Sequence, residues 1–90
     1  MLKYIIERNI PNLGQLTAPE MQAACLRSNN TLKSMSGRVQ WQQSYVTGDK
    51  MYCVYLAENK EAVLEHAAKA GFPADRIEAV KTIVDPTSAE

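Results

Sequence analysis

A two-residue β-hairpin within residues 44–55 constrains the fold of this chain more than any other feature. The segment reads Ser-Tyr-Val-Thr-Gly-Asp-Lys-Met-Tyr-Cys-Val-Tyr, so two runs of strand-forming residues flank Gly48 and Asp49. Glycine at the first central position is typical of a type II′ turn, whose twist matches that of the paired strands. The predicted register pairs Thr47 with Lys50, Tyr45 with Tyr52, Ser44 with Cys53, and Gln42 with Tyr55.

Side chains alternate along each strand, which divides the hairpin into two faces. One face is predicted to carry Trp41, Gln43, Tyr45, Tyr52, Val54 and Leu56, and the other Gln42, Ser44, Val46, Met51, Cys53 and Tyr55. Both faces mix polar with aromatic and aliphatic side chains. If helices cover one face, the other leaves an apolar surface that is unusual on a monomer. We therefore expect a face-to-face homodimer that closes two sheets into a barrel with a central space.

Two helices are predicted from their capping residues. Thr17 and Glu20 fit a capping box, and the helix that follows should end near Ser36-Gly37. Asn59 can cap a second helix over residues 60–70, followed by Gly71 in the left-handed conformation that often ends helices.

Two further strands complete the pattern. Residues 2–8 form a β-rich run that ends at a turn-forming Asn-Ile-Pro-Asn sequence, and residues 76–84 form another that ends at Asp85-Pro86. The order β-α-β-β-α-β predicts an α+β, ferredoxin-like fold, with an antiparallel sheet and two helices on one of its faces.

Length, charge and cysteine content limit the binding partners and the cellular compartment that we expect for this chain. Ninety residues suffice for one domain, residues 1–90, and a chain this short buries only about two-thirds of the surface that its unfolded form exposes. Ten basic and ten acidic residues balance, so no net charge draws it onto nucleic acid or a membrane. No apolar run has the length of a membrane span or signal-peptide core. Cys25 and Cys53 lack metal-type spacing and are interpreted as reduced thiols, so a cytoplasmic location is expected.

Two ionisable side chains are the first candidates for a site. His66 is the only histidine and lies at the edge of the apolar stripe of the second helix, either as a half-buried structural side chain or as part of a site. Glu7 lies near the end of a strand expected at the centre of the sheet, where a carboxylate must meet solvent, a cation or a pocket. We predict that Glu7 and His66 converge on one concave site.

Other side chains carry less specific signals. Cys53 is either a small buried hydrophobe or a nucleophile or soft ligand. Tyr45, Tyr52 and Tyr55 either line a pocket or pack in the core or an interface. Arg8 lacks the neighbours of a phosphate site, and Ser28 is expected to bond back to the preceding helical turn. Because no dinucleotide, phosphate-loop, nucleophile-elbow or zinc-finger motif is present, no organic cofactor is predicted and no catalytic residue is assigned.

Short motifs along the whole chain identify a family. They are Ile6-Glu7-Arg8 with Ile10-Pro11, Gly14-Gln15-Leu16-Thr17, Gln40-Trp41, Ser44-Tyr45-Val46-Thr47, Asp49-Lys50, Tyr52-Cys53-Val54-Tyr55, His66-Ala67, Gly71-Phe72-Pro73 and Asp85-Pro86-Thr87. With these motifs the chain resembles short bacterial proteins of unknown function with a ferredoxin-like fold, some of which are described as nickel-binding. The resemblance implies a small cytoplasmic dimer in which Glu7 and His66 bind nickel or a similar divalent metal.

Two positions depart from the pattern of that family, whose members often carry further histidines where this chain has Asn9 and Gln43. Ni²⁺ favours imidazole and takes several nitrogen or oxygen donors, so one histidine per chain needs carboxylates, water or a dimer mate to complete a site. Nickel binding through His66 is therefore expected to be weaker than in relatives richer in histidine.

Two other functions stay open beside a metal-binding dimer. One is an enzyme or ligand-binding protein for a small molecule, without a cofactor, whose pocket lies between the second helix and the sheet or in the dimer barrel. Its predicted lining is Glu7, Asn9, Trp41, Tyr45, Tyr52, Cys53 and His66. The other is a structural or regulatory dimer with a closed, dry core. The fold supports either, because fold does not determine function.

Overall fold

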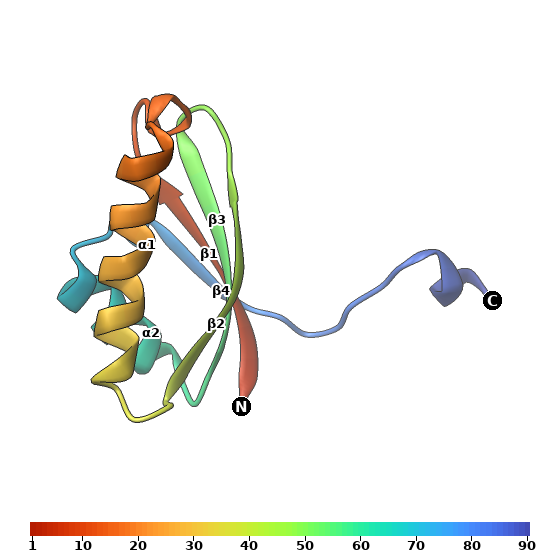
Figure 1. Ribbon diagram of the computed structural model, residues 1–90. Coiled ribbons are helices and arrows are strands. Elements are labelled where there is room, and N and C mark those ends of the chain that lie inside the picture. The colour runs from red at the N-terminus through yellow and green to blue at the C-terminus, as the bar shows by residue number, and fades with distance from the viewer.

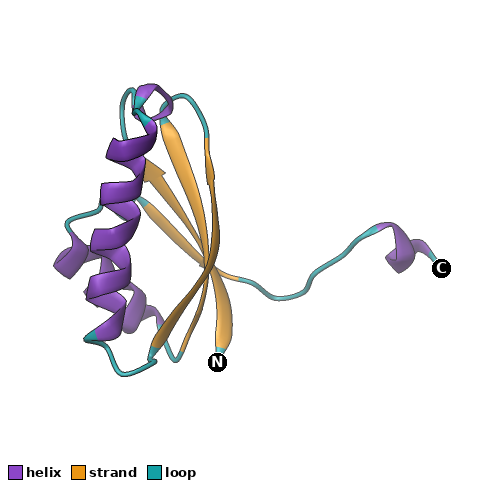
Figure 2. Cartoon of the chain, viewed as in Figure 1, coloured by secondary structure: helices purple, strands orange, loops and turns teal.

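The computed structural model describes all 90 residues and contains a four-stranded antiparallel sheet with two helices (Figure 1). In chain order the elements are β1 (Leu2–Asn9), α1 (Ala18–Lys33), β2 (Val39–Val46), β3 (Lys50–Ala57), α2 (Lys60–Ala70) and β4 (Arg76–Ala79), with short 3₁₀ turns at Leu13–Gln15 and Pro86–Ala89. The spatial order β2-β3-β1-β4 puts β1 and β3 at the centre of the sheet. Both helices lie on one face, here called the inner face (Figure 2). The predicted fold class is confirmed.

The helices begin where their capping residues stand. Thr17 Oγ1 accepts a hydrogen bond from the Glu20 backbone N–H at 3.3 Å, and the Glu20 carboxylate accepts one from the Thr17 backbone N–H at 2.8 Å. Asn59 Oδ1 accepts from the Ala62 backbone N–H at 2.8 Å, and Gly71 ends α2 with a φ of 78°. These side chains satisfy amide groups that have no partner within the helix, which fixes where it starts. Neither helix has the length and hydropathy of a membrane span.

The hairpin has the predicted register at its tip but a different turn. The Thr47 backbone N–H donates to the Lys50 carbonyl at 2.8 Å, and Tyr45 faces Tyr52. Gly48 does not have the positive φ that a type II′ turn requires, so that part of the prediction was wrong. The loop after β1 bonds to the tip, with the Gly14 N–H donating to the Gly48 carbonyl at 2.9 Å. Hydrogen bonds of this kind, between segments distant in the chain, determine the conformation of a turn that the local sequence alone does not determine.

A β-bulge between Trp41 and Gln43 changes which side chains share a face. Ser44 faces Cys53 as predicted, but Trp41 rather than Gln42 faces Tyr55. The extra residue in β2 shifts the alternation of every position before it. The assignment of Trp41 to the face of Tyr45 was therefore wrong.

The two faces of the sheet differ in what covers them. The inner face and the helices form the core, which includes Tyr4, Ile6, Val39, Cys53, Tyr55, Ala57, Ala62 and Val63. The opposite face, here called the outer face, has no helix against it (Figure 1). It carries Lys3, Ile5, Glu7, Tyr45, Tyr52, Val54 and Leu56.

The last strand is shorter than predicted. β4 ends at Ala79 rather than near residue 84, because β1 begins at Leu2 and offers few further partners after the Val80 N–H bonds to the Lys3 carbonyl at 2.8 Å. The residues that follow lead away from the sheet to the C-terminus (Figure 1).

Candidate functional site

Arg8 is the most unusual side chain of the inner face. Side chains alternate along β1, so Tyr4, Ile6 and Arg8 all point towards the helices. Tyr4 and Ile6 belong to the apolar core, but Arg8 places a guanidinium there with only 1% of the residue exposed. Arginine is almost never fully buried unless it is paired, so this position requires an explanation.

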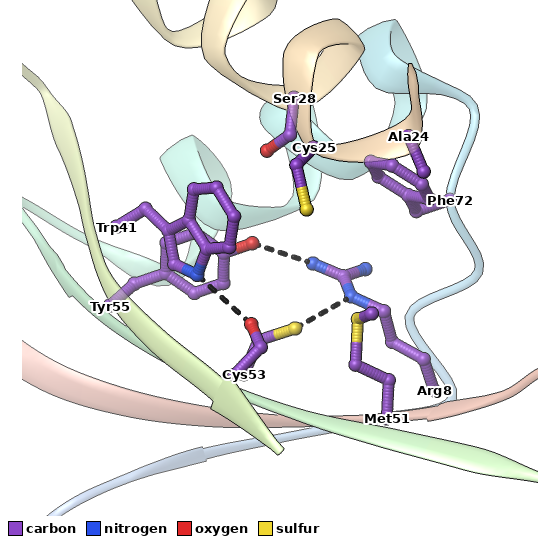
Figure 3. Close-up of a pocket in the computed structure, with 10 residues that line it drawn as sticks. Arg8, Ala24, Cys25, Ser28, Trp41, Met51, Cys53, Tyr55 and Phe72 are labelled. Carbon is purple, nitrogen blue, oxygen red and sulfur yellow. Dashed lines mark hydrogen bonds between the residues drawn. The ribbon is translucent and has the colours of Figure 1, made fainter. Parts of the chain in front are cut away.

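The guanidinium of Arg8 is held on several sides (Figure 3). Its Nε donates to Cys53 Sγ at 3.4 Å, Nη1 donates to the Pro73 carbonyl at 2.6 Å, and Nη2 donates to the Tyr55 hydroxyl at 3.3 Å. The rings of Phe72 and Tyr55 lie 5.5 and 6.0 Å from the guanidinium carbon. These contacts fix the orientation of the group but supply no carboxylate.

The positive charge of Arg8 has no acidic partner. None of the ion pairs in the structure, taken to 4.0 Å, includes Arg8. Burial raises the pKa of Tyr55 to about 12, so this phenol is neutral at pH 7 and cannot balance the charge. An uncompensated buried cation is costly even when its N–H groups are hydrogen-bonded.

His66, on α2, lies next to the residues that surround Arg8. Its Nε2 is 3.1 Å from the Ser28 hydroxyl of α1, and its ring centroid is 5.4 Å from that of Tyr55. His66 Nδ1 is the only buried side-chain nitrogen or oxygen without a hydrogen-bond partner. Burial, followed by the nearby positive charge of Arg8, lowers the pKa of His66 to about 4. The ring is therefore neutral at pH 7.

A cavity of about 30 Å³ lies beside Arg8, between α1 and the sheet (Figure 3). This space is large enough for one or two water molecules. Its walls are mostly apolar, and the residues that line it include Arg8, Ser28, Ser44 and Tyr55, which have polar side-chain groups. Trp41 also lines it and donates its indole N–H to Ser44 Oγ at 2.9 Å. His66 does not line the cavity but contacts Ser28 and Tyr55, which do.

The structure divides the predicted site residues between the two faces of the sheet. Trp41, Cys53 and His66 belong to the inner side, whereas Glu7, Asn9, Tyr45 and Tyr52 belong to the outer face or its edge. The prediction that Glu7 and His66 converge was therefore wrong. Glu7 precedes the inward-facing Arg8, so strand alternation turns it away from the helices. On the outer face the Glu7 carboxylate forms an ion pair with Lys50, with 3.3 Å between Glu7 Oε2 and Lys50 Nζ.

The remaining candidates take ordinary structural positions. The Asn9 backbone N–H donates to Asp75 Oδ2 at 2.6 Å, and Tyr45 is 56% exposed. Tyr52 borders a shallow depression on the outer face with Ile5, Glu7, Arg76 and Glu78. Ser28 bonds to His66 across two helices instead of to its own preceding turn, which was the prediction.

The side chains of one chain do not fit a nickel site. No group of three or more histidine, cysteine, aspartate or glutamate side chains is close enough to hold an ion. His66, the only imidazole, is completely buried, and its Nε2 already bonds to Ser28. Ni²⁺ favours imidazole among several donors, and a nearby guanidinium would repel it.

Of the central residues of this cluster, sequence reasoning did not select Arg8, and it named Tyr55 only as one of three tyrosines that either line a pocket or pack in the core or an interface. The signal was present for Arg8, because it stands in phase with Tyr4 and Ile6 on a strand with alternating burial. The β-bulge that sets Trp41 opposite Tyr55 and the bond from Arg8 to the distant Pro73 carbonyl are not visible in the local pattern.

The comparisons with known proteins place the chain in a family. Residues 4–80 match the model of the family "Nickel responsive protein SCO4226-like", and the chain belongs to this family. Its fold is similar to that in the "Crystal structure analysis of SCO4226 from Streptomyces coelicolor A3(2)", with a TM-score of 0.76, 19% identity, and coverage of 91% of this chain and 99% of that chain. At this identity the likeness shows the fold alone. A search of curated proteins finds no match.

Proposed function

We propose that this chain acts as a homodimer in the nickel response of its family, with a second copy covering the outer face of the sheet. The apolar content of that face supports the proposal. Ile5 is 42% exposed and Tyr45 is 56% exposed, and half-buried Val54 and Leu56 lie on neighbouring positions of β3. Pairing with a second sheet would remove these side chains from water.

The C-terminal segment supports the same proposal. Ile83 is 68% exposed and Val84 is 74% exposed, in a stretch that projects away from the body of the chain (Figure 1). A second copy would offer these side chains an apolar surface. The thiols of Cys25 and Cys53 are both free, which favours a reducing compartment, and we place the dimer in the cytoplasm.

Light scattering coupled to size-exclusion chromatography tests the dimer. The wild-type protein should have twice the mass of one chain at high micromolar concentration, and Ile5→Lys should separate the chains without unfolding them, because it puts a charge in the interface. Leu64→Lys is the matched control, since Leu64 is 44% exposed but lies on α2. A wild-type monomer, or equal dissociation by both variants, would contradict the proposal.

In this dimer nickel binds weakly, at the outer face through Glu7, and His66 does not participate. The Glu7 side chain is 29% exposed and faces the side that a second copy would cover, so two Glu7 carboxylates come from two chains. Carboxylates are poorer donors than imidazole for this ion, and Lys50 competes for Glu7. Both effects make the affinity low.

Calorimetry with tag-free protein tests the nickel assignment. Wild type and His66→Gln should take up Ni²⁺ with the same low affinity, whereas Glu7→Gln should bind more weakly. Glu61→Gln removes an exposed carboxylate from the first turn of α2 and serves as the control. Loss of binding in His66→Gln alone would show that the buried imidazole is the ligand and would refute this assignment.

The cavity beside Arg8 favours a second function, that of a ligand-binding protein or enzyme for a small molecule. A buried cation beside a small cavity is the kind of polar group that orients a ligand in an otherwise apolar pocket. Binding there should change the fluorescence of Trp41, the only tryptophan, and should leave the mass of the assembly unchanged. The two functions are compatible, because they use opposite faces of the sheet.

A further inference from the structure

We infer that the cavity beside Arg8 binds a small monovalent anion of about the size of chloride, held by the guanidinium and by the Ser44 hydroxyl. The inference rests on the ligand-binding function of this cavity and names its ligand class. It does not depend on the dimer or on nickel.

The charge of Arg8 is the first argument. The residue is 1% exposed, and the hydrogen bonds of its guanidinium go to the Cys53 sulfur, a carbonyl and a phenol, none of which is a carboxylate. His66, which contacts Tyr55 from α2, is neutral at pH 7 because its pKa is about 4. An anion in the cavity would supply the missing negative charge.

The hydrogen-bond inventory is the second argument. A guanidinium has five N–H groups, and three of those of Arg8 are used, so two remain. The Ser44 hydroxyl accepts from Trp41, so its own O–H is still available to donate, whereas the Tyr55 hydroxyl accepts from Arg8 and also interacts with Cys53. Arg8 and Ser44, which line the cavity, therefore offer donors to a ligand that only accepts. Such a ligand is an anion.

Size and access are the third argument. A cavity of about 30 Å³ matches a single small ion and excludes a large organic acid. Cys25, Trp41 and Ser44, which line the cavity, are each half-buried, so the gap between α1 and β2 gives an entry from solvent.

Bromide quenching of Trp41 tests the inference directly, because bromide resembles chloride and Trp41 lines the cavity. At constant ionic strength, with gluconate as the balancing anion, quenching of the wild type should saturate with bromide concentration. Arg8→Met should show only the linear, collisional component. Quenching by acrylamide, which is neutral, should be unchanged if the variant is folded.

A pair of tyrosine variants keeps the test decisive if Arg8→Met does not fold. Tyr55→Phe removes the hydroxyl that accepts from Arg8 Nη2 and keeps the ring, so the guanidinium is less firmly oriented and the bromide midpoint should rise by about threefold to tenfold. Tyr52→Phe lies on the same strand but on the outer face, and should leave the midpoint unchanged. A linear wild-type curve, or equal midpoints in both variants, would overturn the inference.

Crystals soaked in bromide give a second measurement. An anomalous peak within hydrogen-bond distance of Arg8 would support the site, whereas an ordered water alone in the cavity would overturn it. A thiolate absorbance that Cys53→Ser lacks would also overturn it, because the counter-charge would then come from the chain itself. If bromide does not bind but other small molecules change the fluorescence of Trp41, the ligand-binding function stands and only the assignment of an anion as the ligand is rejected.

Discussion

Glu7 and Arg8 are neighbours in the chain with opposite charges, yet β1 places them in two environments. Glu7 lies on the outer face, with its side chain 29% exposed and its carboxylate 3.3 Å from Lys50. Arg8 lies on the inner face, 1% exposed and without an acidic partner. One step along a strand reverses the side of the sheet, so these two charges are kept apart although they are adjacent in sequence. The environment of each face, rather than the residue type, decides what a charge can do here.

Replacement of Arg8 is expected to cause the largest loss of stability. Arg8→Ala should lower the free energy of unfolding by about 3 kcal/mol or more, because it opens a cavity and leaves the Pro73 carbonyl without its donor. Arg8→Met fills most of the space and removes a buried charge, so its cost should be clearly smaller. Urea unfolding of the three proteins measures the difference. An equal cost for both variants would mean that the guanidinium and its hydrogen bonds, rather than the packing of the side chain, stabilise the fold.

The second-largest expected effect is a pH dependence of stability that comes from His66, on the inner side of the sheet. His66 has a pKa of about 4 in the folded protein and about 6.5 when unfolded. Below pH 6.5 the unfolded chain takes up a proton that the folded one does not, so stability falls between pH 6.5 and 4. The difference between the two pKa values corresponds to a loss of about 3 kcal/mol in the free energy of unfolding. This loss is absent above pH 6.5, where the ring is neutral in both states.

Urea unfolding at pH 7 and pH 4 checks this prediction. His66→Gln should lose less stability than wild type over this range, because the glutamine does not titrate. The exposed carboxylates titrate alike in both proteins and cancel in the comparison. An identical loss in the two proteins would show that His66 is not held neutral by burial.

The smallest effect belongs to the outer face. Glu7→Gln removes the ion pair with Lys50, in which the lysine side chain is 42% exposed. Exposed pairs of this kind contribute at most about 1 kcal/mol. A thermal unfolding series in low and high salt measures the contribution, which should shrink as salt rises. A cost comparable to that of Arg8→Ala would abolish the contrast between the two faces.

The fold could be predicted because its signals are local. Thr17, Asn59 and Gly71 mark helix ends by their own side chains or backbone freedom, and the Gly48-Asp49 pair marks the hairpin. The site could be predicted only in part, because it depends on contacts between distant segments. The bulge at Trp41 and the bond from Arg8 to the Pro73 carbonyl arise only when the sheet and helices have packed. The predicted pairing of Glu7 with His66 fails because alternation along β1 places Glu7 on the outer face, away from the helices.

NMR titration of the His66 imidazole tests the central claim, that His66 shares its environment with Arg8 and not with Glu7. In the wild type the midpoint should lie near pH 4. Glu7→Gln should leave it unchanged, whereas Arg8→Met should raise it, since removing a nearby positive charge favours protonation of the ring. A midpoint near 6.5 in the wild type, or one that moves with Glu7→Gln and not with Arg8→Met, would contradict the account.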